Sequence, residues 1–472
     1  VCGMIGHVMK IYRNSGLKPA VKAALHDLGA GASRRRQALF YARSLFSEEQ
    51  RESTELSGYC IVKTGNVKPH RDMVCELDKV IEERQPAVIY MDELRDGELL
   101  YKPDYAPDNL MAHNYIGNCV VVRRDLMDDC AVKLSGKASL WSFNKYICGR
   151  CREEEIAHVS RALFEDKGHI GEDGDNIKDR VDGFENASNG KCCKKISVII
   201  PNYEHADDLR RCVESLLYIN TYKNIEIIIV ENNSTSEEIF SCYDELLREH
   251  PDVIRLEKWE GSFNYSAINN YGASCAKGEL LLLLNNDTKI IEPDSLWAMA
   301  EYAVRDNTGA VGACLLYEDK TVQHAGVIVG IGPDRTAVHP NSGVCFIENG
   351  YRDSIHHVQN YSAVTGACLM IKKELFDKLG GLDEELAVAY NDVDFCLRLR
   401  RRGLLNVYVP QALLFHYESK SRGYDDKGER HERFLRESQL FRDRWQNIID
   451  DGDPYYNVKL SKEVPWKPEI KL

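Results

Sequence analysis

The sequence lacks any long hydrophobic run. None of its apolar stretches approaches the roughly 18 residues that a helix needs to cross a bilayer. Positive charge is also scarce, because 61 Lys and Arg stand against 74 Asp and Glu, for a formal net charge of −13. This balance argues against a general nucleic-acid-binding protein. No signal peptide is visible, which predicts a cytoplasmic protein, although the chain begins at Val1 without Met and the natural start is expected upstream.

Two glycine-rich nucleotide motifs are missing as well. The chain contains neither G-x-G-x-x-G nor G-x-x-x-x-G-K-[ST]. The first motif marks dinucleotide-binding folds and the second marks P-loop proteins. Both classes are therefore disfavoured.

Cysteine is frequent, with 16 residues, but it is not arranged as a zinc framework. Cys148 and Cys151 form one C-x-x-C, and His158 and His169 follow at irregular spacing. A zinc or redox site is one interpretation, and a pair of core cysteines is the favoured one. Many other cysteines lie in apolar segments, as expected for small core residues in a reducing cytosol.

The length of 472 residues predicts at least two domains. Residues 1–56 have a basic amphipathic pattern, which is typical either of a peripheral contact with the inner face of the cell membrane or of a solvated face packed on the next domain. Five segments are expected: a helical segment 1–56, an α/β unit 57–170, a polar linker 171–195, an α/β domain 196–425, and a helix with a tail 426–472.

The strongest signal is the alternation of strands and helices within residues 196–425. Buried strands are predicted at 196–200, 225–230 and 280–284, with helices at 207–218, 237–249 and 265–276. Such alternation predicts a mostly parallel, doubly wound sheet. Ligands bind such sheets beyond the carboxyl ends of the strands.

Polar residues follow three of these strands. The leucine strand 280–284 ends in Asn285-Asn286-Asp287, the strand 225–230 ends in Glu231-Asn232, and the first strand ends in Pro201-Asn202-Tyr203-Glu204. A polar turn is the ordinary explanation for one such ending. Three endings that converge on one edge indicate a nucleotide site.

These motifs, together with Phe263-Asn264-Tyr265-Ser266-Ala267-Ile268-Asn269-Asn270 and Asn391-Asp392-Val393-Asp394, resemble family 2 glycosyltransferases of the A-type (GT-A) fold. The motif around Asn264 is similar to that of the branch of this family found in bacterial O-antigen and polysaccharide synthesis. The resemblance spans about residues 196–425. It implies inverting transfer of a sugar from a UDP- or dTDP-sugar to a hydroxyl of a glycan or lipid-linked glycan.

The resemblance also implies roles for single residues. Asp392 matches the carboxylate that takes the acceptor proton, and Asp394 is its neighbouring alternative. Asp287 and His416 match the ligands of a divalent metal, Mn²⁺ or Mg²⁺, which balances the charge of the leaving diphosphate. Glu231 matches the acidic residue that contacts the pyrimidine ring of the nucleotide. The implied nucleotide-sugar site comprises Pro201, Asn202, Tyr203, Glu204, Glu231, Asn232, Asn264, Asn269, Asn285, Asn286, Gly366 and Ala367.

The N-terminal unit repeats the second half of this pattern. Residues 115–126 match residues 364–375 at a constant offset of 249, and residues 159–163 match 409–413 at an offset of 250. At these offsets Ser142 takes the place of Asp392, and Asp166 takes the place of His416. The acidic pair Asp92-Glu93 is expected in a connecting loop. Residues 57–170 are therefore predicted to be a shortened, inactive copy.

Two other functions compete with the enzyme. A sugar-binding pseudoenzyme is one, because the triplet Asn285-Asn286-Asp287, which would supply the metal ligand, holds a single carboxylate. A sugar nucleotidyltransferase is the other, and it ranks last because no Gly-rich, Lys-containing loop follows the first strand. The nucleotide-sugar donor and the glycan acceptor are the expected partners, and nucleic acid is not.

Overall fold

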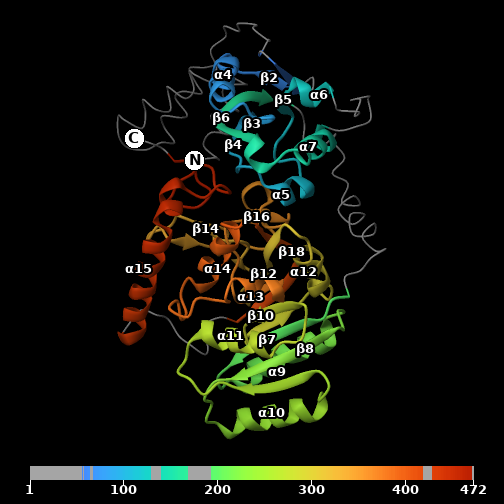
Figure 1. The fold of residues 1–472 in the computed structure, drawn as a ribbon, viewed down its shortest axis with the longest axis vertical. Helices are drawn as coiled ribbons and strands as arrows, with labels where there is room; N and C mark the ends of the chain where they lie inside the picture. The colour runs from blue at the N-terminus through green and yellow to red at the C-terminus, as the bar shows by residue number, and fades with distance from the viewer. Residues whose placement is uncertain are drawn as a thin grey trace. The chain divides into compact units, whose positions relative to one another are not determined.

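The computed structural model describes residues 56, 58–63, 67–128, 140–167, 193–417 and 428–469. The chain forms two compact units, one from residues 1–184 with 454–472 and the other from residues 185–453 (Figure 1). The basic segment expected at 1–56 lies almost wholly outside the described residues, so its membrane contact stays a prediction. Across the described ranges, no helix is both long and apolar enough to span a membrane.

The second unit is built around a ten-stranded mixed sheet of order β11-β18-β12-β17-β10-β7-β8-β9, with β13 beside β12 and β16 beside β18. A separate ribbon joins β14 and β15. The strands are β7 (Ile196–Asn202), β8 (Ile225–Glu231), β9 (Ile254–Lys258), β10 (Leu280–Leu284), β11 (Thr288–Ile290), β12 (Thr308–Leu316), β13 (Val322–His324), β14 (Ile328–Val329), β15 (Ala337–Val338), β16 (Gln359–Tyr361), β17 (Cys368–Lys372) and β18 (Leu405–His416).

The predicted α/β architecture is confirmed, and the structure refines the direction of its strands. Strands β10, β7, β8 and β9 are parallel, as the alternation of elements predicts. Beyond β10 the sheet becomes mixed, because β17 runs antiparallel to both β10 and β12. All five leucines of β10 are buried, which explains their uninterrupted apolar run.

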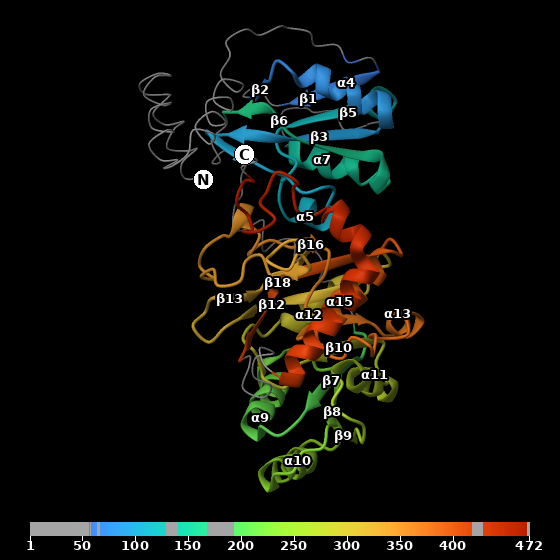
Figure 2. The ribbon, with the colours of Figure 1, turned by 90° about the vertical axis from the view of Figure 1, so that its left-hand side faces the viewer.

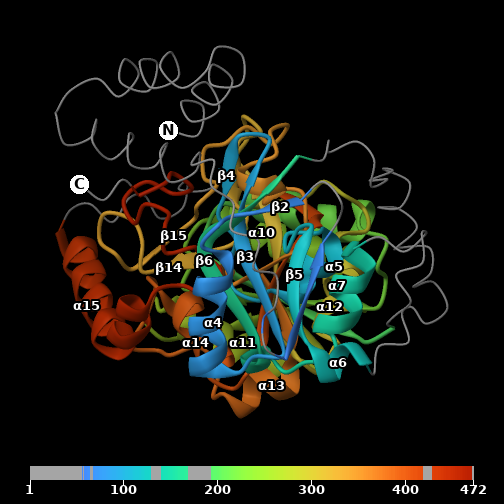
Figure 3. The ribbon, with the colours of Figure 1, turned by 90° about the horizontal axis from the view of Figure 1, so that it is seen from above.

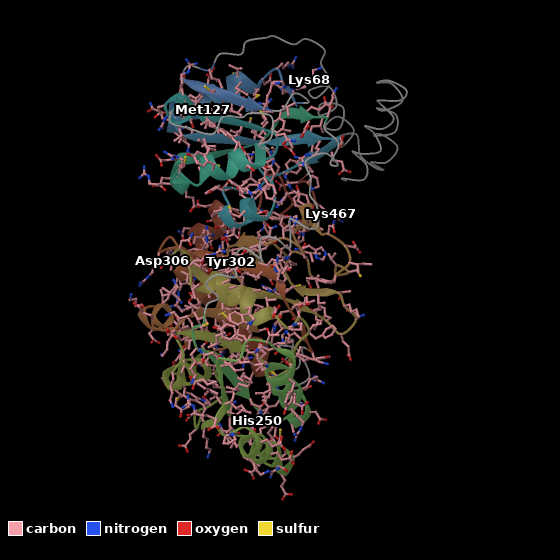
Figure 4. All side chains as sticks on the ribbon, turned by 90° about the vertical axis from the view of Figure 1, so that its right-hand side faces the viewer. Lys68, Met127, His250, Tyr302, Asp306 and Lys467 are labelled. Atoms are coloured by element: carbon pink, nitrogen blue, oxygen red, sulfur yellow. The ribbon has the colours of Figure 1, made fainter. Side chains whose placement is uncertain are left out.

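Helices cover both faces of this sheet, and their predicted positions agree closely with the structure (Figure 2). α9 ends in one π-helical turn at 215–219, and α10 ends beside His250, which Figure 4 labels. The helices are α9 (Ala206–Glu214), α10 (Glu237–Glu249), α11 (Tyr265–Cys275), α12 (Ser295–Ala303), α13 (Lys373–Lys378), α14 (Asn391–Arg400) and α15 (Gly428–Asp451).

Close packing holds α11 on the parallel strands. A Cβ at Gly272 would lie 2.5 Å from Ile199 Cγ2 and 3.0 Å from a methyl group of Val230, so only glycine allows this approach. Residues of α11, α14 and α15 join Leu281 and Leu283 in one buried cluster. These three helices therefore pack over the same side of the sheet.

The first unit contains a six-stranded sheet of order β1-β5-β3-β6-β2, with β4 beside β3 (Figure 3). Its strands are β1 (Tyr59–Lys63), β2 (Val67–Pro69), β3 (Val88–Arg95), β4 (Glu98–Leu100), β5 (Cys119–Arg123) and β6 (Ile156–Asp166). Its helices are α4 (Met73–Arg84), α5 (Pro107–Ala112), α6 (Arg124–Asp128) and α7 (Leu140–Cys148).

This order repeats the order β10-β17-β12-β18-β11 of the second unit. The pairing senses agree as well: β3 and β6 are parallel like β12 and β18, and β1 and β5 are antiparallel like β10 and β17. Asp166 pairs with Val67 as His416 pairs with Thr288. The first unit has no counterpart of β7, β8 and β9 among its described strands.

The acidic pair Asp92-Glu93 does not lie in a connecting loop, because β3 continues through it to Arg95. Both carboxylates are buried and paired. Glu93 contacts Lys102 Nζ at 2.9 Å, and Asp92 contacts His158 Nε2 at 3.0 Å and Asn457 Nδ2. Charged and hydrogen-bonding partners at these distances offset the free-energy cost of burying the two carboxylates within a strand.

The C-x-x-C side chains do not converge on a histidine. Cys148 is buried in α7, where burial raises the pKa of its thiol. His158 instead lies between Asp92 and Asp104, and its ring stacks on Tyr90. His169 lies outside the described residues. These contacts favour the core interpretation of the C-x-x-C.

We predict that His158 makes the stability of the protein depend on pH. Burial alone would lower the pKa of His158, but its contacts with Asp104 and Asp92 outweigh burial and raise it above 6.5. The stabilisation is therefore complete below pH 6.5 and is lost as pH rises through the folded-state pKa. Chemical denaturation of the wild type and of His158→Gln across pH 6–9 should show a smaller difference in unfolding free energy at high pH. A difference that is constant with pH would contradict this account.

Candidate active site

Pairing between β11 and β18 brings Asp287 and His416 together. His416 is the last residue of β18 and lies opposite Thr288, the first residue of β11. The backbone N–H of Tyr417 donates to the carbonyl of Asp287 at 2.9 Å. As a result, His416 Nε2 lies 3.1 Å from Asp287 Oδ1.

These two side chains fit a divalent cation. Asp287 is buried, and its Oδ1 receives no hydrogen bond within the structure. The separation of 3.1 Å agrees with adjacent ligands of an octahedral ion, which lie about 3 Å apart when each bond is about 2.1 Å. Across the described part of the chain, no group of three His, Cys, Asp or Glu side chains gathers as a metal cluster. The described residues would thus offer two ligands to such an ion and leave its other positions to substrate or water.

The charge of Asp287 suits this role. Burial by itself raises the pKa of the carboxyl group, but His416 and Arg211 outweigh it and hold the pKa below 3.8. Asp287 is therefore ionised at neutral pH. Arg211, on α9, packs its guanidinium over the ring of Tyr417 at 4.1 Å.

The two asparagines of the triplet connect the metal end to the rest of the site. Asn285 accepts from Tyr265 Oη at 3.0 Å, and its Nδ2 lies 3.2 Å from His416 Nε2. Asn286 donates to Asn202 Oδ1 at 2.6 Å. The amide groups therefore position neighbouring side chains, and Asp287 supplies the charge.

Asp392 lies in the first turn of α14, where a carboxylate is favoured by the helix dipole. Its Oδ2 accepts from Gly366 N at 2.7 Å, and its Oδ1 accepts from Val393 N. Tyr265 Oη lies 2.9 Å from the Gly366 carbonyl. A Cβ at Gly366 would point at Asp392 and Tyr265, 3.4 and 3.6 Å away. The absence of a side chain keeps the space beside the carboxylate open.

Asp394 has a different environment, although it is only two residues away. It is fully buried and accepts from Trp445 Nε1 and Arg444 of α15 and from Arg398. Asp394 therefore anchors α15, and Asp392 is the one of the two carboxylates that is partly exposed. Arg398 is held in α14 by its bonds to Asp394 and to two backbone carbonyls. Arg422 lies outside the described residues.

Helix α15 also holds the turn that leads into α14. Glu437 Oε2 accepts from the backbone N–H groups of Val388 and Ala389 at 3.2 and 2.5 Å. Tyr390, which begins α14 with φ 61°, stacks on Phe441. These contacts fix where Asp392 enters the site.

The ends of β7 and β8 form the predicted base-binding region. Asn232 N donates to the Asn202 carbonyl at 2.9 Å, and Glu231 Oε1 accepts from Ser234 N at 2.5 Å. Pro201 is half-buried, whereas Tyr203 is 47% exposed and presents its ring to solvent. Ala367 lies on the other side of the triplet, where its carbonyl accepts from Asn285 N.

Three of the predicted binding residues have evident local roles. The carboxylate of Glu204 accepts from Thr235 and Ser236 before α10. Asn264 caps α11 by accepting from Ala267 N. Asn269 is buried, and its Nδ2 donates to the Tyr265 carbonyl. These residues support the site through the backbone.

Sequence reasoning missed four side chains that contact the site: Tyr265, Arg211, Gln323 and His324. Gln323 Oε1 lies 2.5 Å from His416 Nδ1. His324 accepts from Thr365 N at 3.2 Å. The only signal for this pair was a Gln-His step inside the apolar segment Val322–Val327.

Comparison with known proteins identifies relatives of this chain. Residues 194–443 match a family described as "Glycosyltransferase like family 2". The uncharacterized protein y4gI of Sinorhizobium fredii is 33% identical over 399 residues, which are 77% of this chain and 43% of that protein. The O-antigen biosynthesis protein RfbC of Myxococcus xanthus is 33% identical over 400 residues, 76% of this chain and 30% of RfbC.

The chain thus spans less than half the length of these two relatives. A third relative, the dTDP-rhamnosyl transferase RfbF of Shigella flexneri, is 34% identical over 204 residues, 41% of this chain and 60% of RfbF. Among solved structures, the Pyrobaculum calidifontis mannosyltransferase in complex with GDP-Man and Mn²⁺ has a TM-score of 0.39 at 16% identity, covering 54% of this chain and 68% of that one.

We predict that mutation of the two aspartates of α14 has different effects on the free energy of unfolding. Asp394→Ala removes a buried partner of Arg444 and Trp445 and should lower the unfolding free energy by about 3–5 kcal/mol. Asp392→Asn keeps the size and the acceptor oxygen of a partly exposed side chain and should change it by less than about 1 kcal/mol. Urea denaturation measures both values. Equal losses would show that Asp392, too, is chiefly structural.

Proposed function

The chain belongs to the family 2 glycosyltransferases, and from that premise we propose that it transfers a sugar, with inversion, from a nucleoside diphosphate sugar to a hydroxyl of a glycan or lipid-linked glycan. Bacterial surface polysaccharide is the proposed product. The observation that carries the proposal is the series of contacts that runs from Asp392 through Gly366 and Tyr265 to Asn285 and His416. These contacts connect the proposed catalytic base with the proposed metal pair at one edge of the sheet.

In this proposal Asp392 accepts the proton of the attacking acceptor hydroxyl. The hydroxyl oxygen bonds to the anomeric carbon as the bond to the diphosphate breaks, and the diphosphate leaves with the electron pair. Asp287 and His416 would hold a divalent ion, which supplies positive charge for the leaving diphosphate. Arg211 adds a second positive charge near Asp287. The ends of β7 and β8 would bind the nucleotide base of the donor, with Tyr203 and Glu231 as its contacts.

The donor is proposed to be a UDP- or dTDP-sugar. The name of RfbF, a dTDP-rhamnosyl transferase, supports a dTDP-linked donor. A thermal-shift screen over nucleotide sugars with Mn²⁺ or Mg²⁺ would identify the donor without knowledge of the acceptor, because a bound donor stabilises the fold by mass action.

A donor-binding protein without transfer activity is the competing proposal. The triplet Asn285-Asn286-Asp287 contains a single carboxylate, and both amide groups already bond to neighbouring side chains. Donor binding without release of the nucleoside diphosphate, with every acceptor tried, would favour it.

The first unit is proposed to be an inactive copy. Asp166 stands at the strand position of His416, but it accepts from Asn118 at 2.8 Å and lies 3.9 Å from Arg95. Ser142 corresponds to Asp392 and offers no carboxylate. The unit would brace the active domain, shape the acceptor groove or mediate association.

We predict that Asp392→Asn lowers kcat by about 10²–10⁴-fold, because the base is lost, while the Kd for the donor stays within about twofold. Asp287→Asn should instead weaken binding of Mn²⁺ with the nucleoside diphosphate. Nucleoside diphosphate release and calorimetric titration measure the two effects. Undiminished turnover of Asp392→Asn would contradict the proposed base.

We also predict that Ser142→Ala retains turnover, because the first unit performs no chemistry. Asp166→Asn keeps the acceptor of Asn118 and should retain turnover as well. Circular dichroism establishes that each variant is folded. Loss of turnover in a folded variant that still binds donor would show that the first unit takes part in catalysis.

A further inference from the structure

The short strand β13 presents two polar side chains to opposite sides. Successive side chains of a strand point to opposite faces, and in β13 these are Gln323 and His324. Both are buried. His324 Nδ1 contacts the Ala313 carbonyl at 2.9 Å, and its Nε2 accepts from Thr365 N. Gln323 contacts His416 on the other side.

The contact of Gln323 decides which nitrogen of His416 carries the proton. Gln323 Oε1 is an acceptor and lies 2.5 Å from His416 Nδ1, so Nδ1 carries the hydrogen. Asn285 Nδ2, a donor, lies 3.2 Å from Nε2. Both contacts assign the lone pair to Nε2.

In the neutral ring this assignment turns the lone pair of Nε2 toward Asp287 Oδ1, 3.1 Å away. A ring nitrogen and a carboxylate oxygen at this distance are held together by a cation between them, which is either a proton on Nε2 or a metal ion in its place. The pair is therefore complementary to a cation in the tautomer that Gln323 selects.

We propose that Gln323 is a positioning residue that fixes the Nδ1–H tautomer of His416 and so presents Nε2 to a divalent metal. The proposal rests on the proposed metal-assisted transfer and adds to it a residue outside the predicted ligand set. Partners that orient a ligating histidine typically contribute 10–100-fold to metal affinity.

The test replaces Gln323 by Met, which keeps the length of the side chain and removes the acceptor oxygen. Gln323→Glu is the matched control, because it restores an acceptor at the same distance along the side chain. Calorimetric titration with Mn²⁺ in the presence of UDP should give a Kd that is about 10–100-fold weaker for Gln323→Met. The Kd of Gln323→Glu should lie within a few-fold of the wild-type value.

A second measurement reads the tautomer in the metal-free protein. Nitrogen-15 NMR of the histidine rings, recorded at a pH where the ring of His416 is neutral and with His416 assigned by comparison with His416→Gln, should show Nδ1 protonated and Nε2 unprotonated in the wild type. Gln323→Met should lose this preference. The NMR of the wild type decides the assignment even if the Met variant does not fold.

The outcomes separate this proposal from the proposed function. If wild-type protein fails to bind Mn²⁺ with UDP, the metal site itself is wrong. If wild-type protein binds Mn²⁺ but folded Gln323→Met binds it equally well, or if His416 carries its proton on Nε2, the role of Gln323 is overturned while the metal site stands.

Discussion

Antiparallel pairing between β11 and β18 fixes the distance from Asp287 to His416, and the remaining contacts of the site are built outward from that pair. The two residues are far apart in the chain, but the ladder leaves them 3.1 Å apart. Asn285 extends the contacts to Tyr265 and Gly366, and Gly366 reaches Asp392. On the other side Asn286 reaches Asn202 at the end of β7. Geometry at one sheet edge therefore connects the proposed metal pair, the proposed catalytic base and the proposed nucleotide site.

The same strand order serves a different purpose in the first unit. Its β6 delivers Asp166 where β18 delivers His416, but Asn118 and Arg95 lie around that carboxylate. Glu93 and Lys102 form a buried ion pair against Gly117, where a Cβ would lie 2.3 Å from Glu93 Oε2. Charges that satisfy one another inside the fold stabilise a scaffold. In the second unit the residue in the place of Asp166 is His416, and it faces Asp287 instead.

Much of the second unit could be predicted from its sequence. Apolar runs and helical periodicity located β7, β8, β10 and α10 to within a few residues, because each element buries a regular pattern. The polar ends of β7 and β10 were predicted to meet at one sheet edge, and the bond between Asn286 and Asn202 agrees with that prediction. The internal repeat predicted correspondences that the strand order and register bear out, such as Asp166 with His416.

Other features could not be predicted, because they depend on tertiary contacts. The antiparallel insertion of β17 leaves no mark in local periodicity. Asp392 and Asp394 look equivalent in sequence, and only the packing of Trp445 and Arg444 distinguishes them. The three-residue strand β13 is too short to show a period, so the contact between Gln323 and His416 was invisible. The loop expected at Asp92-Glu93 came from the family resemblance, and local sequence shows no sign of the partners that hold both carboxylates inside β3.

A crystal structure of the protein with UDP and Mn²⁺ tests the central claim most directly, since manganese can be located by its anomalous scattering. The account predicts one manganese peak bonded to Asp287 and to His416 Nε2, with the diphosphate completing its coordination. Bound UDP with no manganese at this pair, or with manganese held elsewhere, would contradict it.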